Sequence, residues 1–206
     1  MDNNRAIATR FVYYVASSLD GRIAGPDHDL AFLDSLEGDA GEPDDYARFE
    51  ASVDALVMGA RTWDFLVGYG SWPYGDRPVW VVTHASKVAR LDGATMALHR
   101  GPIVDLVERL RADDAGTIWI VGGGNLAAQF VTAGALDEII LTVAPRVVGL
   151  GPALVDSPEV LPDVDLELVE LRRHGHDGVR AVYRRRPAAD EPAAVAPNGT
   201  QADLAR

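Results

Sequence analysis

The stretch that decides the fold is TIWIVGGGNLAAQF, residues 117–130, where three glycines and an asparagine separate a short apolar run from a helix-like one. Because glycine has no Cβ, the backbone N–H groups of such a turn stay open to a ligand. At the start of a helix these groups also lie at the positive end of the helix dipole, where phosphates bind. The stretch therefore predicts either a phosphate-binding turn or an ordinary strand-to-helix turn that uses glycine for a positive φ.

Length and composition limit the possible classes of protein. The chain has 206 residues, 48% of them hydrophobic, which suits one domain that we place at residues 10–186, with a disordered Ala- and Pro-rich tail at 187–206. The absence of cysteine excludes thiolate nucleophiles, and a net charge of −12 argues against binding to nucleic acid or to an anionic membrane. The chain has neither a run of roughly 20 apolar residues nor a secretory signal, so we expect a cytoplasmic protein.

Short apolar and alternating runs predict a strand-rich α/β fold. Strands are expected at residues 11–17, 55–58, 78–82, 94–98, 117–121, 138–144, 165–173 and 179–186. Helices are expected between them at residues 42–53, 61–68, 102–112 and 125–134. This order indicates a mostly parallel sheet of about eight strands with flanking helices and a C-terminal antiparallel hairpin. His174, His176 and Asp177 fall in the hairpin turn, and we expect no metal site there.

Polar residues follow three strands at the edge where a parallel α/β sheet binds its ligands. The glycine turn at 122–124 is the first. The second is Gly59 to Thr62, which adds a guanidinium and a hydroxyl to the start of a helix, and the third is Thr83 to Lys87, with the only lysine of the chain. Each alone is compatible with a surface turn. Together they predict one cleft that binds a phosphorylated ligand.

The glycine turn also fits the dinucleotide fingerprint of Rossmann folds, G-x-G-x-x-A, at residues 122–127. A Rossmann fold needs an acidic residue about 20 positions further on, where this chain has Leu141 and Thr142. Too few residues follow for the remaining strands. A Rossmann dehydrogenase is therefore the less favoured alternative, and it would prefer NADH.

Four motifs carry a resemblance to a known family: SSLDGRIAGPD (17–27), DALVMGARTW (54–63), VVTHAS (81–86) and VGGGNLAAQF (121–130). They resemble the dihydrofolate reductase fold superfamily, and particularly its bacterial stand-alone branch, which is related to the reductase domain of the bifunctional riboflavin-biosynthesis deaminase-reductase. The resemblance covers most of residues 11–186. It implies a dihydrofolate reductase-like fold, NADPH as cofactor and a possible homodimer.

The resemblance also implies which residues contact NADPH. Ala16 and Ile23 would hold the nicotinamide carboxamide through their backbones, and Thr83, His84, Ser86 and Lys87 would surround the 2′-phosphate. The pyrophosphate and the adenosine side would lie against two strand ends, Gly59, Ala60, Arg61 and Thr62 on one and Val121, Gly122, Gly123, Gly124, Asn125 and Leu126 on the other.

The implied reaction is hydride transfer from NADPH to a small heterocycle that is pterin- or pyrimidine-like. Candidate catalytic residues are Asp29 and Asp20, as carboxyl groups, and Thr142, as a substrate-binding hydroxyl. Val121 stands where the riboflavin reductases carry an acid, and the acidic region 25–52 favours a neutral or cationic substrate. The alternative is a catalytically silent NADPH-binding protein that acts as a sensor or partner module.

Overall fold

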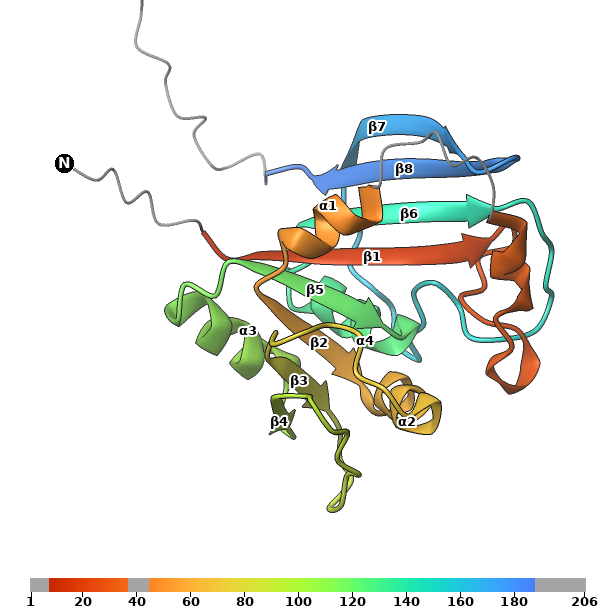
Figure 1. Cartoon of the computed structure of the whole chain (residues 1–206). Coiled ribbons are helices and arrows are strands. Elements are labelled where there is room, and N and C mark those ends of the chain that lie inside the picture. Colours follow the sequence, from red (N-terminus) through yellow and green to blue (C-terminus); the bar gives the residue numbers. More distant parts are fainter. Residues whose placement is uncertain (1–7, 37–44, 188–206) are drawn as a thin grey trace, which may run out of the picture.

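The computed structural model describes residues 8–36 and 45–187, which are built around one eight-stranded sheet (Figure 1). The strands lie side by side in the order β4-β3-β2-β5-β1-β6-β8-β7. Their bounds are β1 Arg10–Ser18, β2 Ala55–Gly59, β3 Val79–Val82, β4 Met96–His99, β5 Thr117–Gly122, β6 Glu138–Ala144, β7 Leu166–His174 and β8 Gly178–Arg185.

Six neighbouring strands, from β4 to β6, pair in parallel. β8 pairs antiparallel with both β6 and β7, so the C-terminal hairpin forms one edge of the sheet. The predicted fold class, a mostly parallel sheet of about eight strands with a terminal hairpin, is confirmed. Since the six parallel strands run in one direction, their carboxyl ends meet at one edge of the sheet.

Within residues 8–36 and 45–187, four α-helices and two short 3-10 helices connect the strands. They are α1 Asp45–Ala51, α2 Ala60–Tyr69, α3 Ile103–Ala112 and α4 Gly124–Thr132, with η1 Pro26–His28 and η2 Ala31–Leu36. The helix expected at 42–53 begins outside the described residues, and the other three expected helices match within two residues. α2 starts directly after β2 and ends at Gly70, whose φ of 80° is the left-handed conformation that favours glycine.

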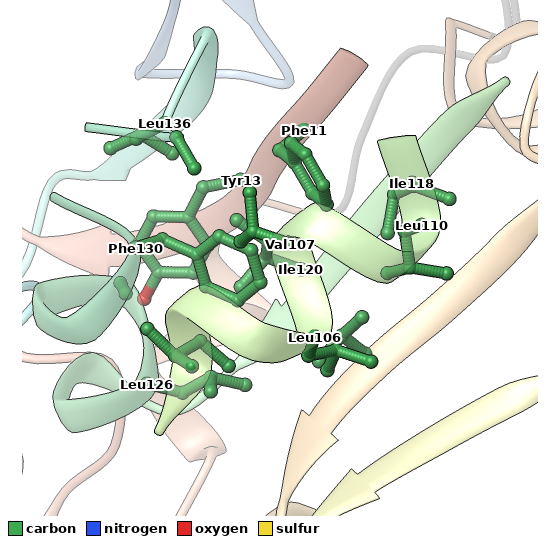
Figure 2. Packing of buried hydrophobic residues seen from close by; sticks show 14 of the residues in the cluster. Phe11, Tyr13, Leu106, Val107, Leu110, Ile118, Ile120, Leu126, Phe130 and Leu136 are labelled. Atoms are coloured by element: carbon green, nitrogen blue, oxygen red, sulfur yellow. The ribbon is translucent and has the colours of Figure 1, made fainter. Parts of the chain in front are cut away.

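The sheet has an apolar core on each face, because successive residues of a strand point to opposite sides. Phe11 and Tyr13 of β1 face α3 and α4, where they pack with Phe130 and Leu106 (Figure 2). Val12 faces the opposite cluster, which includes residues of α1 and α2. Each fully buried large apolar side chain contributes about 1.5–3 kcal/mol. The two-sided burial explains why these strands read as continuous apolar runs.

The limits proposed for the domain, residues 10–186, stay a prediction, and the expected tail lies outside the described residues from position 188 onward. None of the helices in residues 8–36 and 45–187 has the length and apolar character required to cross a bilayer.

Candidate functional site

A cavity of about 1010 Å³ opens at the carboxyl edge of the parallel strands. Its walls include residues that end or follow β1, β2, β3, β4 and β5, together with the first turns of α2 and α4. Arg61, Thr83 and Gly123, one from each of the three polar strand ends, all line it. The structure therefore brings the three ends together around one space.

The glycine turn between β5 and α4 forms one wall. Gly122 has a φ of 136°, which L side chains rarely adopt, and its peptide bond to Gly123 is cis. A Cβ on Gly124 would collide with the carbonyl oxygen of Ala153, so the backbone here has no room for a side chain. Gly123 is the N-cap of α4, with no side-chain cap. The N–H groups of this first turn have no partner within the helix and face an anion-binding position.

A second helix start lies beside it. α2 follows Gly59, which has no side-chain cap, and a Cβ placed on Gly59 would come within 3.7 Å of the carbonyl oxygen of Gly122. The positive ends of two helix dipoles thus lie close together on neighbouring strands. Arg61 and Thr62 add a guanidinium and a hydroxyl to this part of the cavity wall. The pair of turns is suited to a pyrophosphate.

The third strand end, after β3, contributes Thr83 and His84. Thr83 is buried, its N–H donates to the carbonyl of His99 at 3.0 Å, and its hydroxyl oxygen accepts a hydrogen bond from the N–H of Ala85 at 3.0 Å. Ser86 and Lys87, which were expected at the 2′-phosphate, are not among the residues that line the cavity.

Sequence reasoning missed His99 and Arg100 at the end of β4, which do line the cavity. The Arg100 guanidinium donates to the carbonyl of Ala85 at 3.2 Å and to that of Ser86 at 3.5 Å, so it lies against the segment expected at the phosphate. The signal that could have found it is the pairing of β3 with β4. Residues that follow parallel neighbours reach the same edge of the sheet.

Ala16 on β1 and Ile23 on the loop after it line the opposite end of the cavity. The Ile23 N–H donates to the carbonyl of Pro152 at 3.0 Å, which fixes this loop against the connection after β6. Asp20 does not line the cavity. Its carboxylate accepts hydrogen bonds from the N–H groups of Val148 and Gly149, at 2.9 and 2.7 Å, and from the hydroxyl of Ser18 at 2.7 Å. These hydrogen bonds, of which the one from Val148 has the largest effect, lower the pKa of Asp20 to about 2.

The other two residues expected in catalysis also lie away from the cavity wall. Asp29 is exposed, and its carboxylate accepts a hydrogen bond from the N–H of Ala31 at 3.0 Å, at the start of η2. Thr142 is buried on β6 beside Ala16 and does not reach the lining. None of Asp20, Asp29 and Thr142 lines the cavity, although Thr142 pairs with Ala16 in the sheet.

The wall at the Ala16 end is apolar and aromatic, which was also missed. It is formed by Tyr14, Leu30, Leu33, Leu66 and Tyr74. Tyr14 stacks on Phe49 with ring centroids 4.7 Å apart, and the Tyr14 and Tyr74 rings lie 6.1 and 5.3 Å from that of Trp119. Burial has the largest effect on the pKa of Tyr74, and the nearby Tyr46 and Glu50 add to it, so that the pKa is raised to about 12. Tyr14 could have been found from the period of two, since it shares a face with Ala16.

Known proteins resemble the chain in both sequence and structure. The RibD C-terminal domain matches residues 71–179. The uncharacterized protein YwjB of Bacillus subtilis (strain 168) is 34% identical over 165 residues, which cover 80% of this chain and 91% of YwjB. The chain belongs to the RibD C-terminal domain family.

Solved structures place this member of the RibD C-terminal domain family among reductase-like folds. A Shewanella sp. PV-4 protein named for riboflavin biosynthesis is 25% identical with a TM-score of 0.76, over 86% of this chain and 99% of its own. Dihydrofolate reductase from Enterococcus faecalis, in complex with NADP(H) and RAB-propyl, is 17% identical with a TM-score of 0.53, over 86% of this chain and 97% of the enzyme. The latter shows the fold alone. The dihydrofolate reductase-like fold is confirmed, and family and fold together point to an oxidoreductase.

Proposed function

We propose that the protein is an NADPH-dependent reductase that transfers a hydride to a small pterin- or pyrimidine-like heterocycle. The observation that carries the proposal is the single cavity that joins two bare helix N-termini, a cationic strand end and an apolar pocket beside Ala16 and Ile23. A dinucleotide needs all of these except the apolar pocket, which suits a flat substrate.

The residues present fit NADPH. Gly124 has no room for a side chain, Gly122 has a φ that L side chains rarely adopt, and the two adjacent helix starts offer N–H groups to a pyrophosphate. The guanidinium groups of Arg61 and Arg100, with the imidazole of His84, suit a phosphate in a protein whose net charge is −12. The likeness in fold to an NADP(H) complex of dihydrofolate reductase supports this choice of cofactor.

When bound, NADPH supplies the hydride. This chain's part is to hold the reacting carbon of the nicotinamide against the substrate and to exclude water. The backbones of Ala16 and Ile23 would orient the carboxamide, and the aromatic wall of Tyr14 and Tyr74 would stack against the heterocycle. Arg61 and Arg100 would fix the far end of the dinucleotide by charge-assisted hydrogen bonds.

Equilibrium binding tests the cofactor. The purified protein is titrated with NADPH and with NADH, followed by nicotinamide fluorescence and by thermal shift, since a ligand that binds only the native state raises the apparent stability. We expect tighter binding of NADPH. Binding of neither nucleotide would contradict the proposal, and a clear preference for NADH would contradict the choice of cofactor.

A silent NADPH-binding module is the second candidate function, because Asp20, Asp29 and Thr142 do not line the cavity. The two are separated by NADPH oxidation in the presence of pterins, aminopyrimidines and related imines. Oxidation of NADPH by any of these acceptors excludes the silent module. The homodimer and the cytoplasmic location stay predictions, of which the first is checked by sedimentation velocity.

A further inference from the structure

Ionisable side chains line the cavity in two groups that come from different strands. One group lies at the far strands and the glycine turn: Arg61, His84, His99, Arg100 and Asp156. The other lies near β1: Tyr14, His28 and Tyr74. These are all the ionisable residues of the lining within residues 8–36 and 45–187.

The order of the strands separates the two groups. β3 and β4 are three and four positions from β1 in the sheet. At about 4.8 Å per strand, their ends lie about 14 and about 19 Å from the end of β1. Arg61 follows β2, two positions away, and Asp156 is held at the start of α4 by the bond from its N–H to the carbonyl of Gly124, at 3.1 Å. The residues that follow β3 and β4 are therefore remote from a nicotinamide at Ala16 and Ile23, whereas Asp156 lies nearer, since the Cβ position of Gly123 is 3.7 Å from Cδ1 of Ile23.

His28 reaches the wall beside β1 because of the turn that carries it. The N–H of Gly25 donates to the carbonyl of Asp29 at 2.7 Å and closes the loop over the residues between them. Within it Asp27 and His28 have φ values of 54° and 61°. Non-glycine residues in this left-handed region carry strain that proteins keep chiefly at functional sites. Because of this turn, His28 and Leu30 line the cavity, whereas the carboxylate of Asp29, between them, accepts a hydrogen bond from the N–H of Ala31.

Of the three ionisable groups near β1, His28 is the only imidazole, the side chain that most often serves as a general acid. Tyr74 has its pKa raised to about 12 by burial, so it retains its proton. Tyr14 is a second phenol, stacked on Phe49, with the Arg180 guanidinium 5.9 Å from its ring. Arg180 does not line the cavity, and it donates to the Glu170 carboxylate at 2.8 Å. The charged groups near His28 in the chain are the carboxylates of Asp27, Asp29 and Asp34.

The same end of the cavity carries no guanidinium or ammonium among the described lining residues. A phosphate or carboxylate on the substrate would have only His28 to pair with among these lining residues, and such a pair would occupy the group proposed to donate the proton. The aromatic wall favours a flat, uncharged ring.

We infer that His28 donates the proton that accompanies hydride transfer, and that the acceptor is an uncharged planar heterocycle with a reducible C=N bond. The inference rests on the proposed function. The hydride from the nicotinamide adds to the carbon and leaves an oxidised coenzyme. The nitrogen, as its π bond to carbon breaks, takes the proton of the His28 imidazolium, which becomes neutral imidazole and is recharged from solvent because His28 is exposed.

Matched acceptors and matched variants test the inference. NADPH oxidation is measured with two pairs that share a ring and differ in charge: dihydrobiopterin against dihydrofolate, and an aminouracil riboside against its phosphate. His28→Gln is compared with Asp29→Asn, which keeps an oxygen for the Ala31 N–H. We expect the uncharged member of a pair to be reduced faster. We also expect His28→Gln to lower kcat by about 100-fold or more, a typical loss for a general acid, with NADPH affinity unchanged.

The pH profile separates a proton donor from a structural residue. A donor must be protonated, so kcat of the native protein decreases as pH rises, and His28→Gln removes that decrease. Asp29→Asn keeps both the rate and the profile. A native kcat in His28→Gln, a loss confined to NADPH affinity, or equal rates for charged and uncharged acceptors overturns the inference. NADPH binding without reduction of any acceptor overturns it and leaves the silent module, whereas no NADPH binding contradicts the proposed function itself.

Discussion

The two halves of the cavity are built in different ways. The half proposed to bind the coenzyme phosphates, which we call the phosphate half, consists mostly of backbone, with Gly59, Gly122 and Gly124 at or next to the starts of two helices. The half proposed to bind the substrate consists of side chains from separate elements, such as Tyr14 of β1, Leu33 of η2 and Tyr74 of the loop after α2. A backbone site is encoded by a few consecutive residues, whereas a side-chain site depends on how distant elements pack. Four substitutions test this comparison.

The largest expected effect is in the phosphate half. Gly124→Ala places a methyl group against the carbonyl oxygen of Ala153. This atom belongs to the backbone, which cannot shift as easily as the end of a flexible side chain. We expect a loss of stability of about 1–3 kcal/mol, with weaker NADPH binding, measured by urea unfolding and by fluorescence titration.

Gly68→Ala is the control, since nothing lies within 4 Å of its Cβ position within α2. It should stabilise the protein by about 0.5–1 kcal/mol. A Gly124→Ala protein as stable as this control would show that the close approach at Ala153 is not needed.

Arg100→Ser removes the cation that lies against Ala85 and Ser86. A charge-assisted hydrogen bond contributes about 1.5–3 kcal/mol, so the Kd for NADPH should increase by roughly 10- to 100-fold. The Kd for NADH should change little, because NADH has no 2′-phosphate. Lys87→Ser serves as the matched control, since Lys87 does not line the cavity. If the two substitutions changed NADPH binding equally, the phosphate contact would be assigned to the residues after β3 alone and not to Arg100.

Asp20→Asn weakens the bonds that hold residues 148 and 149 to the loop before Ile23. The pKa of Asp20 is lowered to about 2 from 3.8, so its contribution to stability is present above the unfolded-state value and is lost as pH falls through about 2. We expect a small decrease in Tm at neutral pH that shrinks between about pH 4 and about pH 2, measured by circular dichroism. A difference in Tm that stays constant over this range would exclude the carboxylate as its cause.

The smallest effect is expected for Tyr74→Phe. The phenol has its pKa raised to about 12, so it carries no charge near neutrality, and the ring contact with Trp119 is kept. NADPH affinity and kcat should stay within about twofold of the native values, as for substitutions that leave packing intact. A large decrease in kcat would assign the proton transfer to Tyr74 instead of His28.

The sequence was sufficient for the sheet, the hairpin and the three polar strand ends, because each depends on local periodicity or on a short glycine motif. It was not sufficient for Arg100, since its relevance follows only from the position of β4 beside β3. Nor could it distinguish His28 from Asp29. The two are adjacent in the chain, and only the left-handed backbone at Asp27 and His28 determines which of them reaches the cavity.

The connection after β6 has a consequence for how the cavity responds to its ligands. Pro152 and Leu154 bond to the backbone of the loop that carries Ile23, while Ala153 touches Gly124 and Asp156 bonds to it. One short segment therefore spans the two sides on which the nicotinamide and the pyrophosphate are proposed to rest. Because these backbone contacts join the two sides, we expect residues 152–156 to hold them at a fixed spacing.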